Sequence, residues 1–231
     1  MSQTALITGA SQGLGYAIAD RLAGHGTRLV LDARTPADLD AATTTLLDRT
    51  DTVAIAGDIT DPGHRAELAA ATEGKLDLLV LNASALGETP LPTLATADLG
   101  IFRGVLETNT VASLALIQIL LPHVRAAAGT IVLISSDAAV TGYPGWGLYG
   151  ASKAAADQLA RVLAEEEPAI RVYAVDPGDM STAMHAAADP DADPADLLDP
   201  ATAAARLDPL LRGELPSGRY AASELSTVVS S

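Results

Sequence analysis

The sequence predicts an α/β protein in which helices cover both faces of a doubly wound parallel sheet. Short runs rich in Val, Ile and Leu alternate with longer helical stretches along most of the chain. The short runs are almost wholly apolar, a pattern typical of strands that are buried on both faces. A glycine-rich turn follows the first run and leads directly into a helical stretch. Alternation of strand and helix implies right-handed crossovers and therefore parallel strands.

The predicted elements follow one another along the chain without an internal repeat or a linker. Strands are expected at residues 4–8, 28–31, 52–56, 76–81, 130–135 and 171–175, with a last strand region at 216–220. Helices are expected at residues 14–23, 37–49, 62–72, 98–127 and 149–167. Residues 186–200 are rich in Asp, Ala and Pro, so we expect a mobile loop there with a short helix near 194–198.

Length and composition predict a single domain that spans residues 1–231. With 231 residues, of which 48% are hydrophobic, the chain is long enough for one sizeable core and short for two. It contains no cysteine, which excludes disulfides and thiolate nucleophiles. The first residues lack a basic segment, and polar residues and a proline interrupt the longest apolar stretch, 111–124. We therefore expect neither a signal peptide nor a membrane span, and a cytoplasmic location.

The charge of the chain argues against a nucleic-acid partner. The formal net charge is -15, and only Lys75 and Lys153 are lysines, whereas phosphate backbones are bound through clustered basic residues. The spacing of Asp189, Asp191 and Asp193 imitates the start of a calcium loop, but Pro194 stands where that loop needs glycine. The histidines, His25, His64, His123 and His185, are scattered, and His25 and His64 are expected in turns. The sequence therefore predicts no metal site.

A glycine cluster between the first strand and the first helix predicts a nucleotide-binding turn. Its glycines let the backbone turn tightly and let a pyrophosphate approach the N-terminus of the helix, where free N–H groups favour an anion. The turn and the start of the helix hold the expected cofactor contacts Gly9, Ser11, Gln12, Gly13, Leu14 and Gly15.

The spacing Gly-x-x-x-Gly-x-Gly differs from the shorter dinucleotide fingerprint and resembles that of the short-chain dehydrogenase/reductase family. The resemblance extends from Thr8 to Thr182. It implies a Rossmann fold with further cofactor contacts from Asp58, Ile59, Asn82, Ala83, Pro177, Gly178 and Thr182. In the family's Asn-Asn-Ala-Gly motif, Leu81 here replaces the first Asn and Ser84 replaces the Gly.

The segment Tyr149-Gly-Ala-Ser-Lys153 opens a predicted helix, so its Tyr and Lys project from one face, one turn apart. We expect the ammonium to lower the pKa of the phenol toward working pH, as a general acid-base group requires. Ser136 follows the fifth predicted strand, at the edge of the sheet where doubly wound folds bind ligands. Asn109 lies within an apolar helical stretch and needs a polar partner.

The resemblance implies a role for each of these four residues. Tyr149 would donate the proton in reduction, and Lys153 would hold the nicotinamide ribose and tune Tyr149. Ser136 would orient the carbonyl, and Asn109 would order a water that relays protons to the lysine. Tyr149 and Lys153 thus count both as catalytic and as cofactor-binding residues.

The residues after the second strand favour NADP(H) over NAD(H). Ala33 occupies the position that is acidic in NAD-preferring members of the family, and Arg34 follows it. An arginine can pair bidentately with a 2′-phosphate, whereas a carboxylate accepts from a free 2′-hydroxyl. Asp32 lies one residue earlier and could still reach the ribose, which keeps NAD(H) possible.

Few residues indicate the substrate. Tyr143 and Trp146 lie in a Gly/Pro-rich loop just before Tyr149 and are expected to form a substrate wall. Met180, Met184 and His185 are expected on the opposite side, within a substrate lid at residues 180–200.

The sequence thus predicts an NADP(H)-dependent oxidoreductase that reduces ketones or aldehydes. An epimerase or dehydratase that retains its NADP(H) and a non-catalytic NADP(H) sensor are the alternatives. The expected partner is a small-molecule carbonyl or alcohol substrate. The two long apolar helices at 98–127 and 149–167 resemble the family's dimerising pair, which implies a homodimer or homotetramer.

Overall fold

The computed structural model describes residues 3–225, and its strands form one parallel sheet. In chain order they are β1 (Thr4–Ile7), β2 (Arg28–Ala33), β3 (Thr52–Ala56), β4 (Leu78–Leu81), β5 (Thr130–Ile134), β6 (Arg171–Asp176) and β7 (Gly218–Ala221). Across the sheet they lie in the order β3-β2-β1-β4-β5-β6-β7, and every neighbouring pair is parallel. The predicted fold class is confirmed, while the ends of the predicted domain lie outside the described residues.

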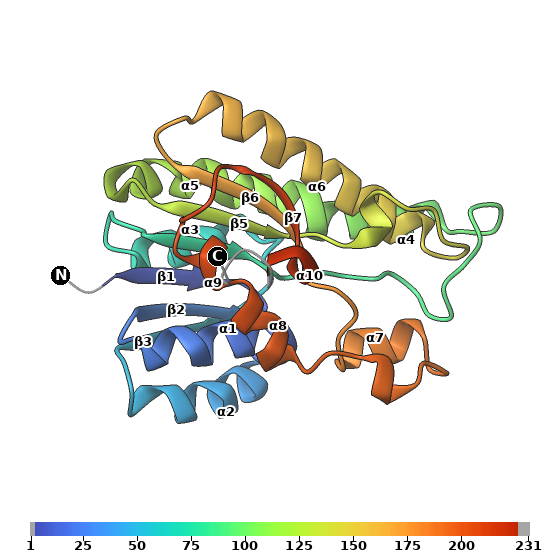
Figure 1. Ribbon diagram of the computed structural model, residues 1–231, viewed down its shortest axis with the longest axis horizontal. Helices are drawn as coiled ribbons and strands as arrows, with labels where there is room; N and C mark the ends of the chain where they lie inside the picture. The colour runs from blue at the N-terminus through green and yellow to red at the C-terminus, as the bar shows by residue number, and fades with distance from the viewer. Residues whose placement is uncertain (1–2, 226–231) are drawn as a thin grey trace.

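Helices cover both faces of this sheet (Figure 1). They are α1 (Gly13–Gly24), α2 (Pro36–Leu47), α3 (Pro62–Ala71), α4 (Leu99–Leu106), α5 (Ala112–Ala127), α6 (Gly147–Glu166), α7 (Ala183–Ala188), α8 (Pro200–Arg206), α9 (Asp208–Leu211) and α10 (Ala222–Leu225). One core packs α1, α2, α8 and α9 against the sheet, and a second packs α3, α5 and α6 against its other face.

The helix starts that position the site are capped by local sequence. Asp61 precedes Pro62 and accepts a hydrogen bond from Gly63 N at 2.8 Å, which satisfies a free donor of the first turn of α3. Asp98 caps α4 in the same way. The sequence-based starts at residues 62 and 98 are therefore correct to within one residue.

The predicted helix 98–127 is interrupted. A π-helical turn, η1 (Glu107–Val111), separates α4 from α5 and contains Asn109. Such turns occur mostly as single insertions in α-helices, often at functional sites. The apolar periodicity on both sides of η1 does not reveal the interruption.

The stretch from Leu99 to Ala127 has the length and apolar composition of a membrane span. In the fold, however, α5 buries Leu116, Leu120 and Val124 in the core beneath the sheet. This packing is that of a core helix, whose apolar face contacts strands.

The C-terminal third also differs from the sequence-based elements. Helix α7 (Ala183–Ala188) begins before the loop expected at 186–200 and extends into it, and only a 3-10 turn, η3 (Pro194–Asp196), forms near 194–198. An isolated parallel bridge joins Met180 to Leu198, so the two ends of this segment lie together. Short runs of Ala with a Thr cap at Thr182 account for a helix that was not predicted.

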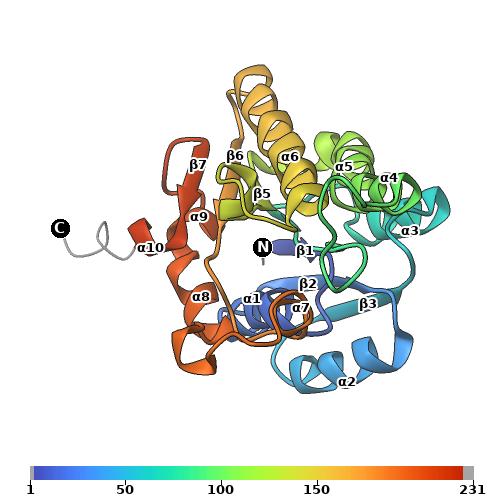
Figure 2. The ribbon, with the colours of Figure 1, turned by 90° about the vertical axis from the view of Figure 1, so that its right-hand side faces the viewer.

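The loops that follow the strands meet at the carboxyl edge of the sheet, which Figure 2 faces. Helix α7 lies in front of this edge, near the N-terminal end of α1. Ligands of doubly wound sheets bind at such an edge.

Candidate active site

A cavity of about 310 Å³ occupies the carboxyl edge of the sheet. It is lined by loops that follow β1, β2, β3, β4, β5 and β6, and by α6 and α7. The predicted site residues that line it are Gly9, Ser11, Gln12, Gly13, Leu14, Arg34, Asp58, Ile59, Asn82, Ala83, Ser136, Trp146, Tyr149, Lys153, Pro177, Gly178, Met180, Thr182, Met184 and His185. Gly15, Asn109 and Tyr143 do not line it.

The turn after β1 is held by the loop after β4. Asn82 Nδ2 donates to the carbonyl oxygens of Thr8 and Gly9, each at 3.0 Å. Thr8 Oγ1 accepts from the backbone N–H groups of Asn82 and Ala83. A Cβ at Gly15 would overlap the Gly9 carbonyl oxygen, so this glycine is required for close packing although it is absent from the cavity wall.

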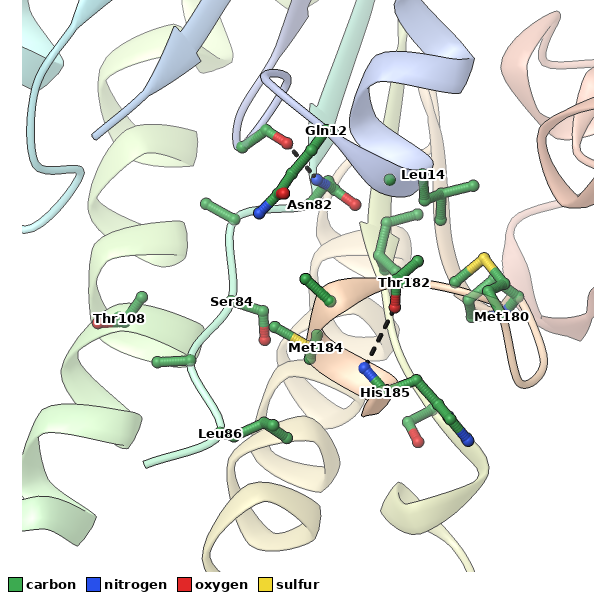
Figure 3. Close-up of a pocket in the computed structure, with 18 of the residues that line it drawn as sticks. Gln12, Leu14, Asn82, Ser84, Leu86, Thr108, Met180, Thr182, Met184 and His185 are labelled. Carbon is green, nitrogen blue, oxygen red and sulfur yellow. Dashed lines mark hydrogen bonds between the residues drawn. The ribbon is translucent and has the colours of Figure 1, made fainter. Parts of the chain in front are cut away.

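The turn leaves room for an anion at the start of α1. Gly9 and Gly13 have φ of +65° and +56°, the left-handed region that glycine enters without strain. Gln12 and Leu14 lie beside Asn82 at the mouth of this turn (Figure 3). Because the first N–H groups of a helix lack intrahelical partners, this arrangement fits a pyrophosphate.

The carboxylate of Asp32 is paired with a histidine side chain. Its Oδ1 lies 2.6 Å from His64 Nε2, and both side chains are almost fully buried. His64 lies in the first turn of α3, so the expectation that it stands in a turn is wrong. Burial raises the pKa of Asp32, and the hydrogen bond with His64 opposes this effect. Asp32 thus supports the fold between β2 and α3.

Arg34 lies just beyond β2, is exposed, and lines the cavity. Across residues 3–225 its guanidinium has no hydrogen bond or ion pair, although Asp58 is near enough for Arg34 to contribute to a lowered pKa of that carboxyl. The main causes of that lowered pKa are two hydrogen bonds from Thr60 to Asp58. Arg34 therefore has donors available for a ligand.

Tyr149 and Lys153 lie side by side on α6, as their spacing predicts, but the phenol behaves differently from the prediction. Burial raises the pKa of Tyr149 well above its ordinary value, while the hydroxyls of Ser84 and Ser136 oppose this effect. Lys153 Nζ donates to the Ile134 carbonyl oxygen at 2.7 Å and lies 5.4 Å from the centre of the Tyr149 ring. The expected lowering of the phenol pKa by the lysine is therefore wrong, because desolvation dominates.

Lys153 is itself fully desolvated. Burial lowers the pKa of its ammonium to about 8, and Asp157 acts in the opposite direction. At neutral pH the ammonium therefore still carries its proton, with a reduced margin.

Ser136 stands at the end of β5, as predicted. Its hydroxyl lies 3.1 Å from Asp137 Oδ1 and accepts from Ala138 N at the same distance. Tyr143 OH donates to Asp137 Oδ2 at 2.7 Å, but Tyr143 does not itself line the cavity. Trp146 packs edge-to-face on Tyr149, with 5.7 Å between ring centres. Of the predicted aromatic wall, only Trp146 therefore lines the cavity.

Asn109 does not face the cavity. Its Oδ1 accepts from Ala85 N at 2.8 Å, and its Nδ2 donates to Ala85 O and to Ser152 Oγ, each at 2.9 Å. Protein groups thus contact both ends of the amide, and Asn109 joins the loop after β4 to α6. The predicted role of Asn109 in ordering a water that relays protons to Lys153 stays a prediction.

Met184 and His185 reach the cavity from α7 (Figure 3). Thr182 Oγ1 accepts from His185 N at 3.2 Å and caps this helix. Ser84 and Leu86, on the loop after β4, lie on the opposite side of the space from α7 in Figure 3. The buried Ser84 Oγ has no hydrogen-bond partner of good geometry.

The following residues line the cavity but were not predicted as site residues: Thr35, Asp38, Ser84, Ala85, Leu86, Thr108, Ile134, Ser135, Asp137, Asp176, Asp179 and Ala183. Ser84 was noted only as a departure from a motif, although its place next to Asn82 and Ala83 was a usable signal. Within residues 3–225 no group of three or more His, Cys, Asp or Glu side chains is arranged to hold a metal ion.

The fold and this cavity define a nucleotide-binding protein of the doubly wound class. A family model described as short chain dehydrogenase matches residues 3–193. An uncharacterized oxidoreductase of Schizosaccharomyces pombe is 36% identical over 190 residues, which cover 80% of this chain and 75% of the relative. Sepiapterin reductase of Rattus norvegicus is 36% identical over 195 residues, which cover 78% and 74%.

Solved structures of short chain dehydrogenases have the same fold. A short chain dehydrogenase from Shigella flexneri 2a, in complex with NADP, superposes with a TM-score of 0.86 at 26% identity, covering 96% of this chain and 97% of that one. The chain belongs to the short-chain dehydrogenase/reductase family. It is an oxidoreductase of that family, whose members bind NAD or NADP.

The buried pair of Asp32 and His64 makes a stability prediction. Replacing His64 by Leu leaves a buried carboxylate without its partner, so we expect the free energy of unfolding at neutral pH to fall by about 3–5 kcal/mol. The replacement removes effects that lower the pKa of Asp32, so this pKa rises further in the folded state. Folded H64L then holds a proton that the unfolded chain releases near pH ~4, and its stability decreases as pH rises above that value.

Denaturant unfolding of H64L across pH 4–8 measures this effect. The double variant H64L/D32N has no carboxyl at this position and serves as the matched control, with a flatter pH dependence. Parallel pH profiles for the two variants would contradict the assignment of the effect to Asp32.

Proposed function

We propose that the protein is an NADP(H)-dependent reductase of ketones or aldehydes. The observation that carries the proposal is the pairing of a protonated, buried phenol, Tyr149, with the Ser136 hydroxyl in one cavity. A group that is to donate a proton must hold it at working pH, and the raised pKa of Tyr149 has this consequence.

The four predicted residues take distinct roles in this proposal. NADPH, when bound, supplies the hydride. Tyr149 OH donates a proton to the oxygen of the substrate carbonyl, and Ser136 Oγ holds that oxygen in place. The Lys153 ammonium places a positive charge beside the phenol, which favours release of its proton. Asn109 keeps the loop after β4 and α6 in register through Ala85 and Ser152.

The cofactor proposal rests on three features of the cavity. The glycine turn at the start of α1 fits a pyrophosphate. Among residues 3–225 the Arg34 guanidinium makes no hydrogen bond or ion pair, which leaves it available to a 2′-phosphate. Asp32 also lines the cavity, but its carboxylate is already bonded to His64 and to Gly9 N. Asp58, Ile59, Asn82, Ala83, Pro177, Gly178 and Thr182 line the remainder. NADP bound to the Shigella flexneri relative supports the same choice.

The charges around the reacting centre support a substrate that carries no carboxylate near its carbonyl. Asp137, Asp176 and Asp179 all line this part of the cavity, and the charges of Asp137 and Asp176 contribute to the raised pKa of Tyr149. Unlike charges attract and like charges repel most strongly where solvent is excluded. A neutral or cationic ketone or aldehyde fits this field better than an oxo acid.

Residues 180–200 are proposed as the substrate lid. Their two ends are joined by the Met180–Leu198 bridge, and α7 between them carries Met184 and His185 to the cavity. These two features support a lid role for the segment on the substrate side of the site.

We also propose a cytoplasmic homodimer or homotetramer. Exposed apolar side chains occur on the two helical stretches that are expected to pair subunits. Val111 lies at the end of η1, Ile119 on α5 and Val162 on α6. Burial of such side chains between two copies is favourable.

Replacing Tyr149 by Phe tests the proposed reaction. The variant loses only the proton donor, so turnover of NADPH with a carbonyl panel should fall below a hundredth of the parent rate. Its affinity for NADPH should stay within about twofold, because the ring remains. Tyr16→Phe, whose hydroxyl bonds Thr45 outside the cavity, is the control. Y149F turnover within about tenfold of the parent would contradict the role of Tyr149.

Replacing Arg34 by Ala tests the cofactor. We expect the parent to bind NADPH more tightly than NADH, and R34A to reduce this difference by about 1.5–3 kcal/mol. Calorimetric titration with both cofactors measures the difference. Arg103→Ala, an exposed arginine on α4, should leave it unchanged. Equal affinities of the parent for NADH and NADPH would overturn the preference.

A substrate series tests the charge argument. Three ketones of one carbon skeleton, ending in a methyl, a carboxylate or a quaternary ammonium group, are compared by kcat/KM. The carboxylate should be about tenfold worse than the methyl compound, and Asp179→Asn should narrow that gap. A carboxylate compound that is preferred by the parent would contradict the proposed substrate class.

A further inference from the structure

One guanidinium connects the last strand of the sheet to two groups of the site. Arg219, on β7, donates from Nη2 to the Ser136 carbonyl oxygen at 3.0 Å. From Nε it donates to Asp157 Oδ2 at 2.8 Å. Arg219 thus contacts the loop after β5 and helix α6 at once, across sequence separations of 83 and 62 residues.

Asp157 depends on this contact. It lies one helical turn after Lys153 on the same helix, and only 4% of its side chain is exposed. Its second oxygen, Oδ1, is buried and has no hydrogen-bond partner within the described part of the chain, residues 3–225. A buried carboxylate without a cation is strongly destabilising, so Arg219 is what allows an acidic group at this depth.

Asp157 in turn acts on Lys153. The Asp157 carboxylate favours the charged form of the lysine and opposes the desolvation that lowers its pKa. The other titratable group in contact with the lysine is Tyr149 on α6, and Ile134 of β5 contributes its backbone carbonyl. Asp176, at the end of β6, lines the same cavity. Ser84, from the loop after β4, is uncharged. Asp157 is therefore the acidic side chain that supports the buried ammonium.

We propose that Arg219 is a positioning residue of the reductase site, fixing the backbone of Ser136 and holding Asp157 beneath Lys153. Arg219 does not line the cavity, so it acts through Ser136 and Asp157. The inference rests on the proposed roles of Ser136 and Lys153. A serine that orients a carbonyl must be held to within a fraction of an ångström, and a bond to its own carbonyl oxygen does this directly.

The pKa of Lys153 can be measured directly by NMR and without substrate. Lys75 and Lys153 are the chain's two lysines, so their signals are simple to distinguish. In protein labelled with ¹³C at lysine Cε, their two signals titrate separately, and Lys75 is an internal reference. In Asp157→Asn the Lys153 signal should titrate at lower pH than in the parent, by about one pH unit, and Lys75 should not move. The alkaline limb of the kcat/KM profile should shift by the same amount and in the same direction.

Replacing Arg219 by Met tests whether its hydrogen bond to the Ser136 carbonyl oxygen positions Ser136. We expect kcat to fall about tenfold or more while the NADPH dissociation constant stays within about twofold, since the nucleotide end of the cavity is not touched. Arg219→Lys keeps the positive charge but cannot bond Ser136 and Asp157 at once as the guanidinium does. Its activity should lie between those of R219M and the parent. Arg212→Met removes an equally charged arginine that pairs with Asp208 and Glu214, away from the site, and is the control.

The outcomes separate this inference from the proposed function. An unmoved Lys153 titration in D157N, together with R219M kinetics equal to those of R212M, would overturn the positioning role even if the parent reduces carbonyls. If D157N is too unstable to titrate, equal kcat in R219M, R219K and the parent overturns the role by itself. A parent that turns over no carbonyl compound refutes the proposed function, whereas the lysine titration would still report the Asp157 contact.

Discussion

The close approach of the turn after β1 to the loop after β4 is the constraint on which the rest of the site depends. Only a glycine at position 15 leaves space for the Gly9 carbonyl oxygen and for Asn82 Nδ2, which donates to that oxygen. With Asn82 in place, the chain that follows is directed along the cavity toward Ala85. Two neighbouring strands of a parallel sheet thus become one wall of a binding site.

This wall continues through hydrogen bonds to the helix that carries the acid-base pair. Ala85 is held at both its N–H and its C=O by the amide of Asn109, and the same amide donates to Ser152. Ser152 Oγ then donates to the carbonyl oxygen of Tyr149 at 2.6 Å. The π-helical turn is the local distortion in which Asn109 makes all three bonds. The glycine turn and Tyr149 are therefore linked by hydrogen bonds through Asn82, Ala85, Asn109 and Ser152.

The sequence predicted the elements that local periodicity controls and missed those that depend on distant partners. Buried strands, the glycine turn and the Tyr149/Lys153 spacing repeat over a few residues, so a single sequence is enough to find them. The partners of Asp32, Asn109 and Tyr143 depend on which loops meet at the sheet edge, and no local pattern records this. The π-helical turn was missed for a related reason, since one extra residue in a long apolar helix alters the apolar pattern very little. The direction of the Tyr149 pKa was wrong because spacing reveals a nearby charge but not the extent of burial.

Burial also explains why the site needs several charged groups around a single lysine. Desolvation disfavours the charged form of Lys153, whose ammonium has one hydrogen-bond partner among residues 3–225, the Ile134 carbonyl oxygen. An acidic neighbour restores the charged form but is itself costly at that depth, so it requires a cation of its own. The arginine that supplies this cation comes from the far end of the chain, on β7. A buried basic group in the middle of the fold thus makes the C-terminal strand part of the site's electrostatics, although that strand contributes no side chain to the cavity.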